Sequence, residues 1–254
     1  AVRAMYLFSG MADVAAETGD DTLMEACKKL WKNVVEKRMY ITGGVGSNPN
    51  GERFTFDYDL PNETAYAETC AAIGLVFWAQ RMLNQEGDSV YADIMEKALY
   101  NGVLSGVSLD GTKFFYANPL QVYPPAYKYN TLGVGKNFTP TRQEWFGCAC
   151  CPPNVARIIS SLGQYIYSQS QDQMQNELYV NLYIQSTADF QIKSGRVALK
   201  QKTLYPWDGK VEITILPEKI DEFILSLRIP GWCRKANVNI NGNQVENIGN
   251  LKEK

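Results

Sequence analysis

Four residues in two short motifs could together bind a metal ion. Glu68 and Cys70 stand two positions apart, and Cys150 and Cys151 are adjacent and run into Pro152-Pro153-Asn154. Three sulfurs and one carboxylate form a ligand set that suits tetrahedral Zn²⁺. The chain of 254 residues contains no histidine, which excludes the histidine-based catalytic triads and metal sites. Any chemistry must therefore use cysteine and carboxylate groups.

The two ligand pairs can converge on one ion only if each pair lies where a helix begins. Residues two apart in a helix point to nearly opposite sides, so Glu68 and Cys70 cannot share a metal from the middle of a helix. Cys150 and Cys151 precede a double proline, which is tolerated in the first turn. Unpaired amides and the positive end of the helix dipole favour thiolate there, and zinc deprotonates bound thiols. This placement favours a nucleophilic sulfur at neutral pH.

The six cysteines favour metal binding over disulfides, because three of them crowd together at 148, 150 and 151 in a chain of this length. A reducing compartment is favoured by the same thiols. Their spacing matches none of the recognised iron–sulfur motifs. Cys27, on the apolar side of a predicted helix, and Cys233, in a strand-rich region, are predicted to be small buried hydrophobic residues.

The charge balance of the chain restricts its partners. There are 27 acidic and 25 basic residues, and no Lys/Arg cluster alternates with aromatic residues, so neither a nucleic-acid groove nor an anionic membrane surface is expected. No apolar run approaches the roughly 20 residues needed to cross a bilayer. Small, neutral molecules fit better as partners.

The chain changes from helical to strand patterns near residue 170, which predicts an α+β protein with a helical domain at 1–170 and an antiparallel β-sandwich domain at 171–254, which could be truncated. Apolar periodicity predicts helices at about 1–18, 20–35, 66–85, 89–105 and 152–166. Strands are predicted at 178–184, 188–192, 197–205, 211–216 and 223–229, with hairpin turns at Asp110-Gly111 and Asn241-Gly242.

The segments between the helices are loops. The run Thr42–Ser47 resembles a phosphate cradle, but it lacks the GKS/GKT ending of that motif and is predicted to be a turn. Residues 119–147 form a long irregular excursion, of the kind that often carries function.

Spacing alone favours a structural zinc, because four protein ligands usually make a closed, inert site. Two features favour a reactive site instead. Five helices do not need the metal staple that very small domains need. The loops near the ligands are also rich in polar and aromatic groups suited to a polar substrate, among them Glu52, Asp57, Tyr58, Asp59, Tyr66, Glu144 and Trp145.

Six segments of the chain carry distinctive motifs: Tyr40–Ser47, Gly51–Thr55, Asp57–Asn62, Tyr66–Cys70, Trp145–Asn154 and Leu227–Trp232. In these segments the chain resembles the zinc-cysteine β-L-arabinofuranosidases, glycoside hydrolase family 127 and its close relatives. The resemblance is collinear over essentially the whole chain, and the combination of E-T-C with C-A-C-C-P-P-N is its most specific part.

The resemblance implies a role for individual residues. Glu68, Cys70, Cys150 and Cys151 match the four zinc ligands, Cys150 also matches the cysteine nucleophile, and Glu52 matches the general acid/base. Cys148 matches a family cysteine that is not a ligand. The implied reaction is retaining hydrolysis that releases L-arabinose through a glycosyl thioether. By analogy with carboxylate-based retaining enzymes, we expect Glu52 and the Cys150 sulfur about 5 to 6 Å apart.

The family fold is an (α/α)6 barrel followed by β-sandwich domains, so the resemblance implies that residues 1–170 are the C-terminal part of such a barrel. A Gly-His pair commonly precedes the segment that matches Ala1-Val2-Arg3, and the chain is therefore expected to be a fragment. Isolated, it is expected to be poorly active or to need a partner fragment. The compartment and the oligomeric state stay open.

Several assignments have alternatives in the sequence. Tyr58, Tyr66 and Trp145 could stack on a sugar, although aromatic residues more often pack in cores. Arg142 and Glu144 could bond sugar hydroxyls or surround the zinc ligands. A two-carboxylate glycosidase or lyase using Glu63 or Asp59, with a structural zinc, is a second interpretation. A non-catalytic carbohydrate-binding or scaffold protein is a third. The aglycone, hydroxyproline-linked or cell-wall arabinan, is not specified.

Overall fold

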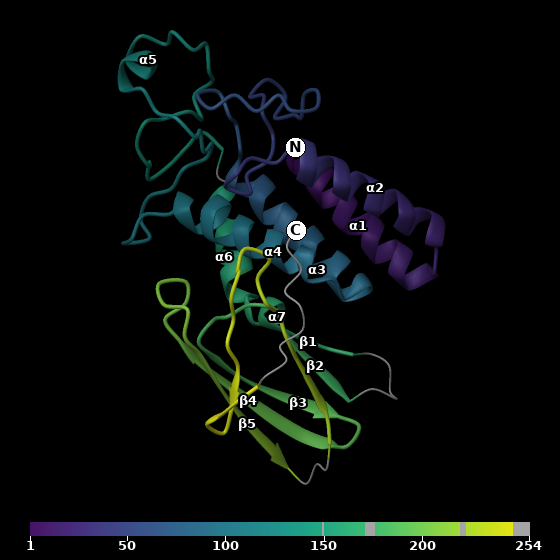
Figure 1. Ribbon diagram of the computed structural model, residues 1–254. Helices are drawn as coiled ribbons and strands as arrows, with labels where there is room; N and C mark the ends of the chain where they lie inside the picture. Colours follow the sequence, from purple (N-terminus) through teal and green to yellow (C-terminus); the bar gives the residue numbers. More distant parts are fainter. Residues whose placement is uncertain (149, 171–175, 219–221, 246–254) are drawn as a thin grey trace. The chain divides into compact units, whose positions relative to one another are not determined.

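The computed structural model describes residues 1–148, 150–170, 176–218 and 222–245, and it divides into two compact units, Ala1–Ser160 and Ser161–Lys254. Figure 1 shows the first unit as mostly helical and the second as mostly strands. The predicted domain boundary at 170/171 adjoins residues 171–175, which lie outside the described residues. The domain limits 1–170 and 171–254 stay a prediction.

Helix α3 forms the centre of the first unit, where α1, α4, η1 and α6 all contact it. Its first two turns, Thr69–Val76, are buried on every side, as expected for a helix inside a core. Trp78 is fully buried and packs against Phe8 and Trp31, with ring centroids 4.9 and 5.0 Å away. The elements of this unit are α1 (Val2–Thr18), α2 (Asp21–Lys37), α3 (Thr69–Glu86), α4 (Ser89–Lys97), the π-helical η1 (Ala98–Val103), η2 (Leu104–Gly106), α5 (Pro124–Lys128) and α6 (Cys151–Ser160).

Two Gly-Asp pairs join consecutive helices. Gly19 ends α1 and Gly87 ends α3, both in the left-handed conformation that glycine adopts without strain. Asp20 and Asp88 then cap the next helices by accepting hydrogen bonds from backbone amides two or three residues ahead. The predicted end of the first helix and the predicted start of the second are thereby confirmed, whereas α2 ends at Lys37, beyond the predicted limit of 35.

The second unit contains two three-stranded sheets and a short ribbon among its described residues. One core, which includes Leu178, Val197 and Leu199, is lined by strands of both three-stranded sheets. The elements are α7 (Gly163–Ile166), β1 (Tyr167–Gln169), β2 (Glu177–Val180), β3 (Ser186–Ile192), β4 (Gly195–Thr203), β5 (Val211–Glu218), β6 (Ile224–Leu227), β7 (Asn239–Ile240) and β8 (Asn243–Gln244), with sheet orders β1-β2-β6, β3-β4-β5 and β7-β8.

The structure departs from the sequence predictions at several points. Strand β2 pairs with β6 in parallel, so the sheet that contains them is not wholly antiparallel as predicted. The helix predicted at 152–166 is interrupted after Ser160, and the one predicted at 89–105 becomes π-helical at Ala98. Cys27 is buried as predicted, but Cys233 is only half-buried. The (α/α)6 barrel stays a prediction.

Both predicted turns form. Asn241 and Gly242 have φ angles of 52° and 87°, the left-handed pair that a two-residue hairpin requires. The turn at Asp110-Gly111 is closed by a bridge between Val107 and Phe114. Of the helices within the described residues, none has both the length and the hydropathy needed to cross a membrane.

Candidate metal and catalytic site

The four predicted ligands lie together in the first unit. One ligand atom from each of Glu68, Cys70, Cys150 and Cys151 lies within 4.8 Å of all the others. The Sγ atoms of Cys70 and Cys151 are 3.6 Å apart, those of Cys150 and Cys151 are 3.9 Å apart, and Cys150 Sγ lies 3.6 Å from Glu68 Oε1. Around a tetrahedral Zn²⁺, bond lengths of about 2.3 Å for sulfur and 2.1 Å for oxygen place neighbouring ligand atoms about 3.6 to 3.8 Å apart. The spacing therefore fits zinc.

Each ligand pair lies at the start of a helix, as the sequence predicts. Glu68 is the N-cap residue of α3 and Cys70 lies in its first turn, whereas Cys151 is the first residue of α6 and Cys150 precedes it. The Glu68 side chain makes no capping hydrogen bond, which leaves its carboxylate for the cluster. Because α3 and α6 pack together, the two pairs meet.

The cluster has one accessible member. Glu68, Cys70 and Cys151 are 2%, 1% and 0% exposed, whereas Cys150 is only partly buried. A purely structural site would not need a partly exposed cysteine. Cys150 is thus the ligand that a bound substrate could reach.

A bound cation would satisfy the buried ligand atoms of the cluster. Glu68 Oε2 is buried and has no hydrogen-bond partner among the described residues, which costs free energy unless an ion satisfies it. Burial, and then the nearby Cys70, raises the pKa of Glu68 to about 8. Burial also raises the pKa of Cys150 to about 12, although its hydrogen bond with Tyr116 acts in the opposite direction. A divalent metal would stabilise the anionic forms of these groups.

Two uncharged side chains contact the sulfurs directly. The Asn154 Nδ2 amide donates to Cys70 Sγ at 3.0 Å, and its Oδ1 accepts from Tyr6 Oη at 3.2 Å and Arg157 Nη2 at 2.7 Å. Tyr116 Oη lies 3.2 Å from Cys150 Sγ. Sequence reasoning assigned no role to Asn154 or Tyr116, although Asn154 belongs to the Pro-Pro-Asn motif that follows the paired cysteines.

Glu52 lies on a tight turn between Asn48 and Arg53, which pair as an isolated antiparallel bridge. Its φ of 51° is in the left-handed region, and its amide donates to Pro49 O at 3.2 Å. The Tyr66 hydroxyl donates to Glu52 Oε1 at 2.9 Å.

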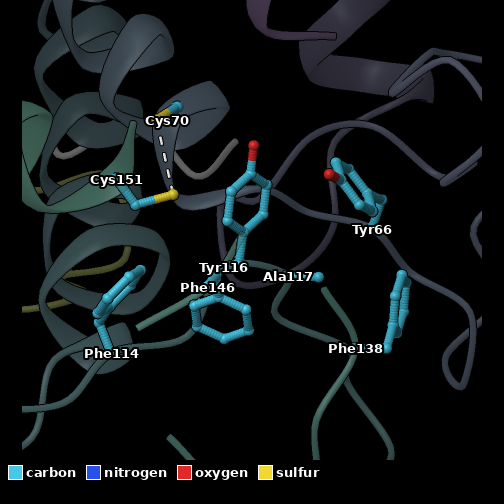
Figure 2. Close-up of a cluster of buried hydrophobic side chains, with 8 residues drawn as sticks. All are labelled: Tyr66, Cys70, Phe114, Tyr116, Ala117, Phe138, Phe146 and Cys151. Atoms are coloured by element: carbon cyan, nitrogen blue, oxygen red, sulfur yellow. Dashed lines mark hydrogen bonds between the residues drawn. The ribbon is translucent and has the colours of Figure 1, made fainter. Parts of the chain in front are cut away.

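Tyr66 and Tyr116 connect Glu52 with Cys150 through one aromatic cluster, which also contains Phe114, Phe138 and Phe146. Their ring centroids are 6.2 Å apart, and Figure 2 shows the Tyr116 ring between Cys151 on one side and Tyr66 on the other. Burial raises the pKa of both tyrosines well above the usual range, so both hydroxyls keep their protons. One hydroxyl bonds the candidate acid/base and the other bonds the candidate nucleophile.

Two of the remaining predicted substrate residues, Arg142 and Glu144, contact other parts of the protein. Arg142 donates to the carbonyls of Ser105 and Gly106 and stacks 4.9 Å from the Phe115 ring centroid. Glu144 is exposed and pairs with Lys113 at 3.9 Å. Tyr58 and Trp145 are 69% and 68% exposed, whereas Tyr66 is only 2% exposed. Their contacts with a sugar stay predictions.

The alternative carboxylates Asp59 and Glu63 are both half-buried, and neither belongs to the four-residue cluster. Cys148 is exposed and likewise lies outside that cluster, whereas Ala149 is outside the described residues.

Comparisons with known proteins agree on one family. Residues 1–164 match the model of the β-L-arabinofuranosidase GH127 catalytic domain, and residues 177–252 match the GH127 middle domain. A non-reducing end β-L-arabinofuranosidase from Bifidobacterium longum is 40% identical over 261 residues, which cover 100% of this chain and 38% of that protein. The chain therefore spans well under half the length of this curated relative.

Solved structures give the same result. A GH127 β-L-arabinofuranosidase from Geobacillus stearothermophilus T6 is 54% identical with a TM-score of 0.92, over 100% of this chain and 39% of that one. A GH127 β-arabinofuranosidase, BT3674, is 42% identical with a TM-score of 0.84, over 98% of this chain and 39% of that one.

Proposed function

Because the chain belongs to the β-L-arabinofuranosidase family GH127, we propose that the protein containing it releases L-arabinose from β-L-arabinofuranosides with retention of configuration. The observation that carries the proposal is the cluster of Glu68, Cys70, Cys150 and Cys151, in which only Cys150 is partly exposed. Glu52 and Cys150 each bond a tyrosine of one aromatic cluster, which supports their action on the same substrate.

Zinc fits the cluster in ligand type, spacing and burial. Glu68, Cys70, Cys150 and Cys151 would hold it, and the bound metal would keep the sulfurs deprotonated at neutral pH. Tyr116 would donate a hydrogen bond to the Cys150 thiolate and orient it.

In the first step, Cys150 Sγ attacks the anomeric carbon, and a C–S bond forms as the glycosidic C–O bond breaks. Glu52, protonated, gives its proton to the departing oxygen. In the second step, the Glu52 carboxylate accepts a proton from water, whose oxygen bonds the anomeric carbon. The C–S bond breaks and its electron pair returns to Cys150. Two inversions give net retention, with Glu52 expected about 5 to 6 Å from the sulfur.

The test uses substitutions in the full-length protein that carries this chain. Cys150→Ser and Glu52→Gln are expected to abolish release of arabinose from an alkyl β-L-arabinofuranoside, whose leaving group needs a proton. Cys148→Ser, which removes an exposed thiol two positions from the nucleophile, is the matched control and should retain activity. Unchanged turnover in the Cys150 variant would contradict the proposed mechanism.

Mass spectrometry separates the competing interpretations. A slow fluorinated β-L-arabinofuranoside should trap an adduct on the peptide that contains Cys150. An adduct on Asp59 or Glu63 would instead indicate a two-carboxylate glycosidase. Tight sugar binding without turnover, in zinc-loaded protein, would indicate a non-catalytic carbohydrate-binding protein.

A further inference from the structure

A chain of two hydrogen bonds ends on Glu52. Asn137 Nδ2 donates to Tyr66 Oη at 3.1 Å, and Tyr66 Oη donates to Glu52 Oε1 at 2.9 Å. Asn137 comes from the irregular segment 119–147, Tyr66 precedes α3, and Glu52 lies on its own turn. Three segments that are distant in sequence therefore meet at one carboxyl group.

The chemistry of the amide and the phenol fixes the direction of the two hydrogen bonds. A phenol has a single proton, and an amide nitrogen can only donate. Since Asn137 already donates to the tyrosine oxygen, the hydroxyl proton is left to point at Glu52. Asn137 thus makes Tyr66 an obligatory donor toward the carboxyl group.

Packing contacts fix the position of the Tyr66 ring, as hydrogen bonds fix that of its hydroxyl. It is 2% exposed, and its centroid lies 5.8 Å from that of Phe138 and 6.2 Å from that of Tyr116. Phe138 follows Asn137 directly, so the same short segment contacts both the ring and the hydroxyl of Tyr66. Figure 2 shows Phe138 beside the Tyr66 ring.

Glu52 needs such a constraint because its turn belongs to no helix or strand and its side chain is only partly buried. An unrestrained glutamate samples many rotamers, and acid catalysis requires the proton to be within hydrogen-bond reach of the departing oxygen. The bond from Tyr66 occupies Oε1, which leaves Oε2 to exchange a proton with substrate or water.

We propose that Tyr66 and Asn137 are positioning residues for Glu52, which hold its carboxyl group so that Oε2 faces the glycosidic oxygen. This inference rests on the proposed function, in which Glu52 is the acid/base. It gives Tyr66 a role through its hydroxyl rather than as a surface on which a sugar stacks.

The test measures kcat/KM for β-L-arabinofuranosides whose leaving groups range from an alkyl alcohol to a dinitrophenol. A poor leaving group needs its proton from Glu52, whereas dinitrophenolate departs without one. Tyr66→Phe, which keeps the ring, should lower kcat/KM by about 10- to 100-fold for the alkyl glycoside and by less than about threefold for the dinitrophenyl glycoside. Asn137→Ala should give a smaller loss with the same dependence.

Tyr116→Phe is the matched control. The hydroxyl that it removes belongs to the same aromatic cluster but contacts Cys150. Its loss should be similar for all leaving groups. The inference would be overturned if Tyr66→Phe lowered kcat/KM equally for all leaving groups, or not at all, and Glu52→Gln still showed the steep leaving-group dependence. If Glu52→Gln itself lacks that dependence, the acid/base assignment in the proposed function fails instead. Thermal unfolding and zinc content of each variant separate these results from misfolding.

Discussion

Asn154 is expected to control the affinity of the cluster for zinc. Its Nδ2 amide donates to Cys70 Sγ at 3.0 Å, and Cys70 is 1% exposed, so water cannot easily replace the donor in Asn154→Ala. A hydrogen bond to a charged group contributes about 1.5 to 3 kcal/mol, and each 1.4 kcal/mol is about tenfold in a binding constant. We therefore expect zinc to bind about 10- to 100-fold more weakly, the range typical of groups that orient metal ligands.

A second variant tests the orientation of the amide. Asn154→Asp keeps the volume and the oxygen that accepts from Tyr6 and Arg157, but it replaces the donor by a carboxylate oxygen beside a thiolate. Its affinity should fall further than that of the alanine variant.

The assay is competition for zinc with a chromophoric chelator at constant pH. Asn137→Ala serves as the control, because its amide bonds Tyr66 and none of the ligands, and its affinity should match that of the parent protein. Affinities within about threefold of the parent in both Asn154 variants would refute a role for the N–H···S bond. An aspartate variant that binds as well as the parent would refute the assigned orientation.

Three further predictions concern stability. Gly43→Ala should lower the free energy of unfolding by about 2 to 4 kcal/mol, because its φ is +82° and a Cβ would meet the Ala98 backbone at 2.8 Å. Gly111→Ala, with φ +73° and open space, should cost about 1 kcal/mol; urea unfolding distinguishes the two. A chelator should lower the thermal unfolding midpoint of the parent protein but not of Cys151→Ser, which calorimetry would show. Lys37 and other partners lower the pKa of Asp57, so its stabilisation is present above the ordinary carboxyl range and is lost as pH falls. Asp57→Asn should therefore destabilise the protein more at pH 7 than at about pH 3 in guanidinium titrations.

Local patterns in the sequence were sufficient for the junction between the first two helices and for grouping the four cluster residues. Gly19-Asp20 combines a helix end with a helix start, and each needs only its own neighbours along the chain. The ligand pairs could be placed at helix starts because residues two apart in a helix diverge. These inferences depend on chain geometry over a few residues.

Contacts between distant segments could not be predicted in the same way. Asn137 meets Tyr66 only because of the path taken by residues 119–147, which have no periodicity to indicate it. Alternation identified β2 and β6 as strands, but alternation is the same for parallel and antiparallel neighbours, so their parallel pairing was missed. The contact of Tyr116 with Cys150 was not predicted either, because an aromatic residue after a hairpin more often packs in a core.

The ion pairs of Asp57 explain how a turn without regular structure can hold Glu52, the proposed acid/base. Asp57 was interpreted from the sequence as a polar group suited to a substrate. In the structure it bonds Lys37 Nζ at 2.9 Å and Arg38 Nη2 at 2.6 Å, both at the C-terminal end of α2. Arg38 also donates to the carbonyl of Thr55, whose hydroxyl lies 2.6 Å from that of Ser47.

These contacts fasten the backbone on either side of Glu52 to a helix, while Tyr66 holds its carboxyl group. Substitutions that remove one or the other of these two constraints should differ in their kinetic effects. Loosening the backbone should disturb the position of the whole turn and act on every substrate alike, whereas removing the tyrosine hydroxyl should act only where a proton must be transferred. Asp57→Asn is therefore expected to lower kcat/KM by a similar factor for alkyl and dinitrophenyl glycosides. A leaving-group dependence as steep as that of Tyr66→Phe would show that the ion pairs act on the carboxyl group itself.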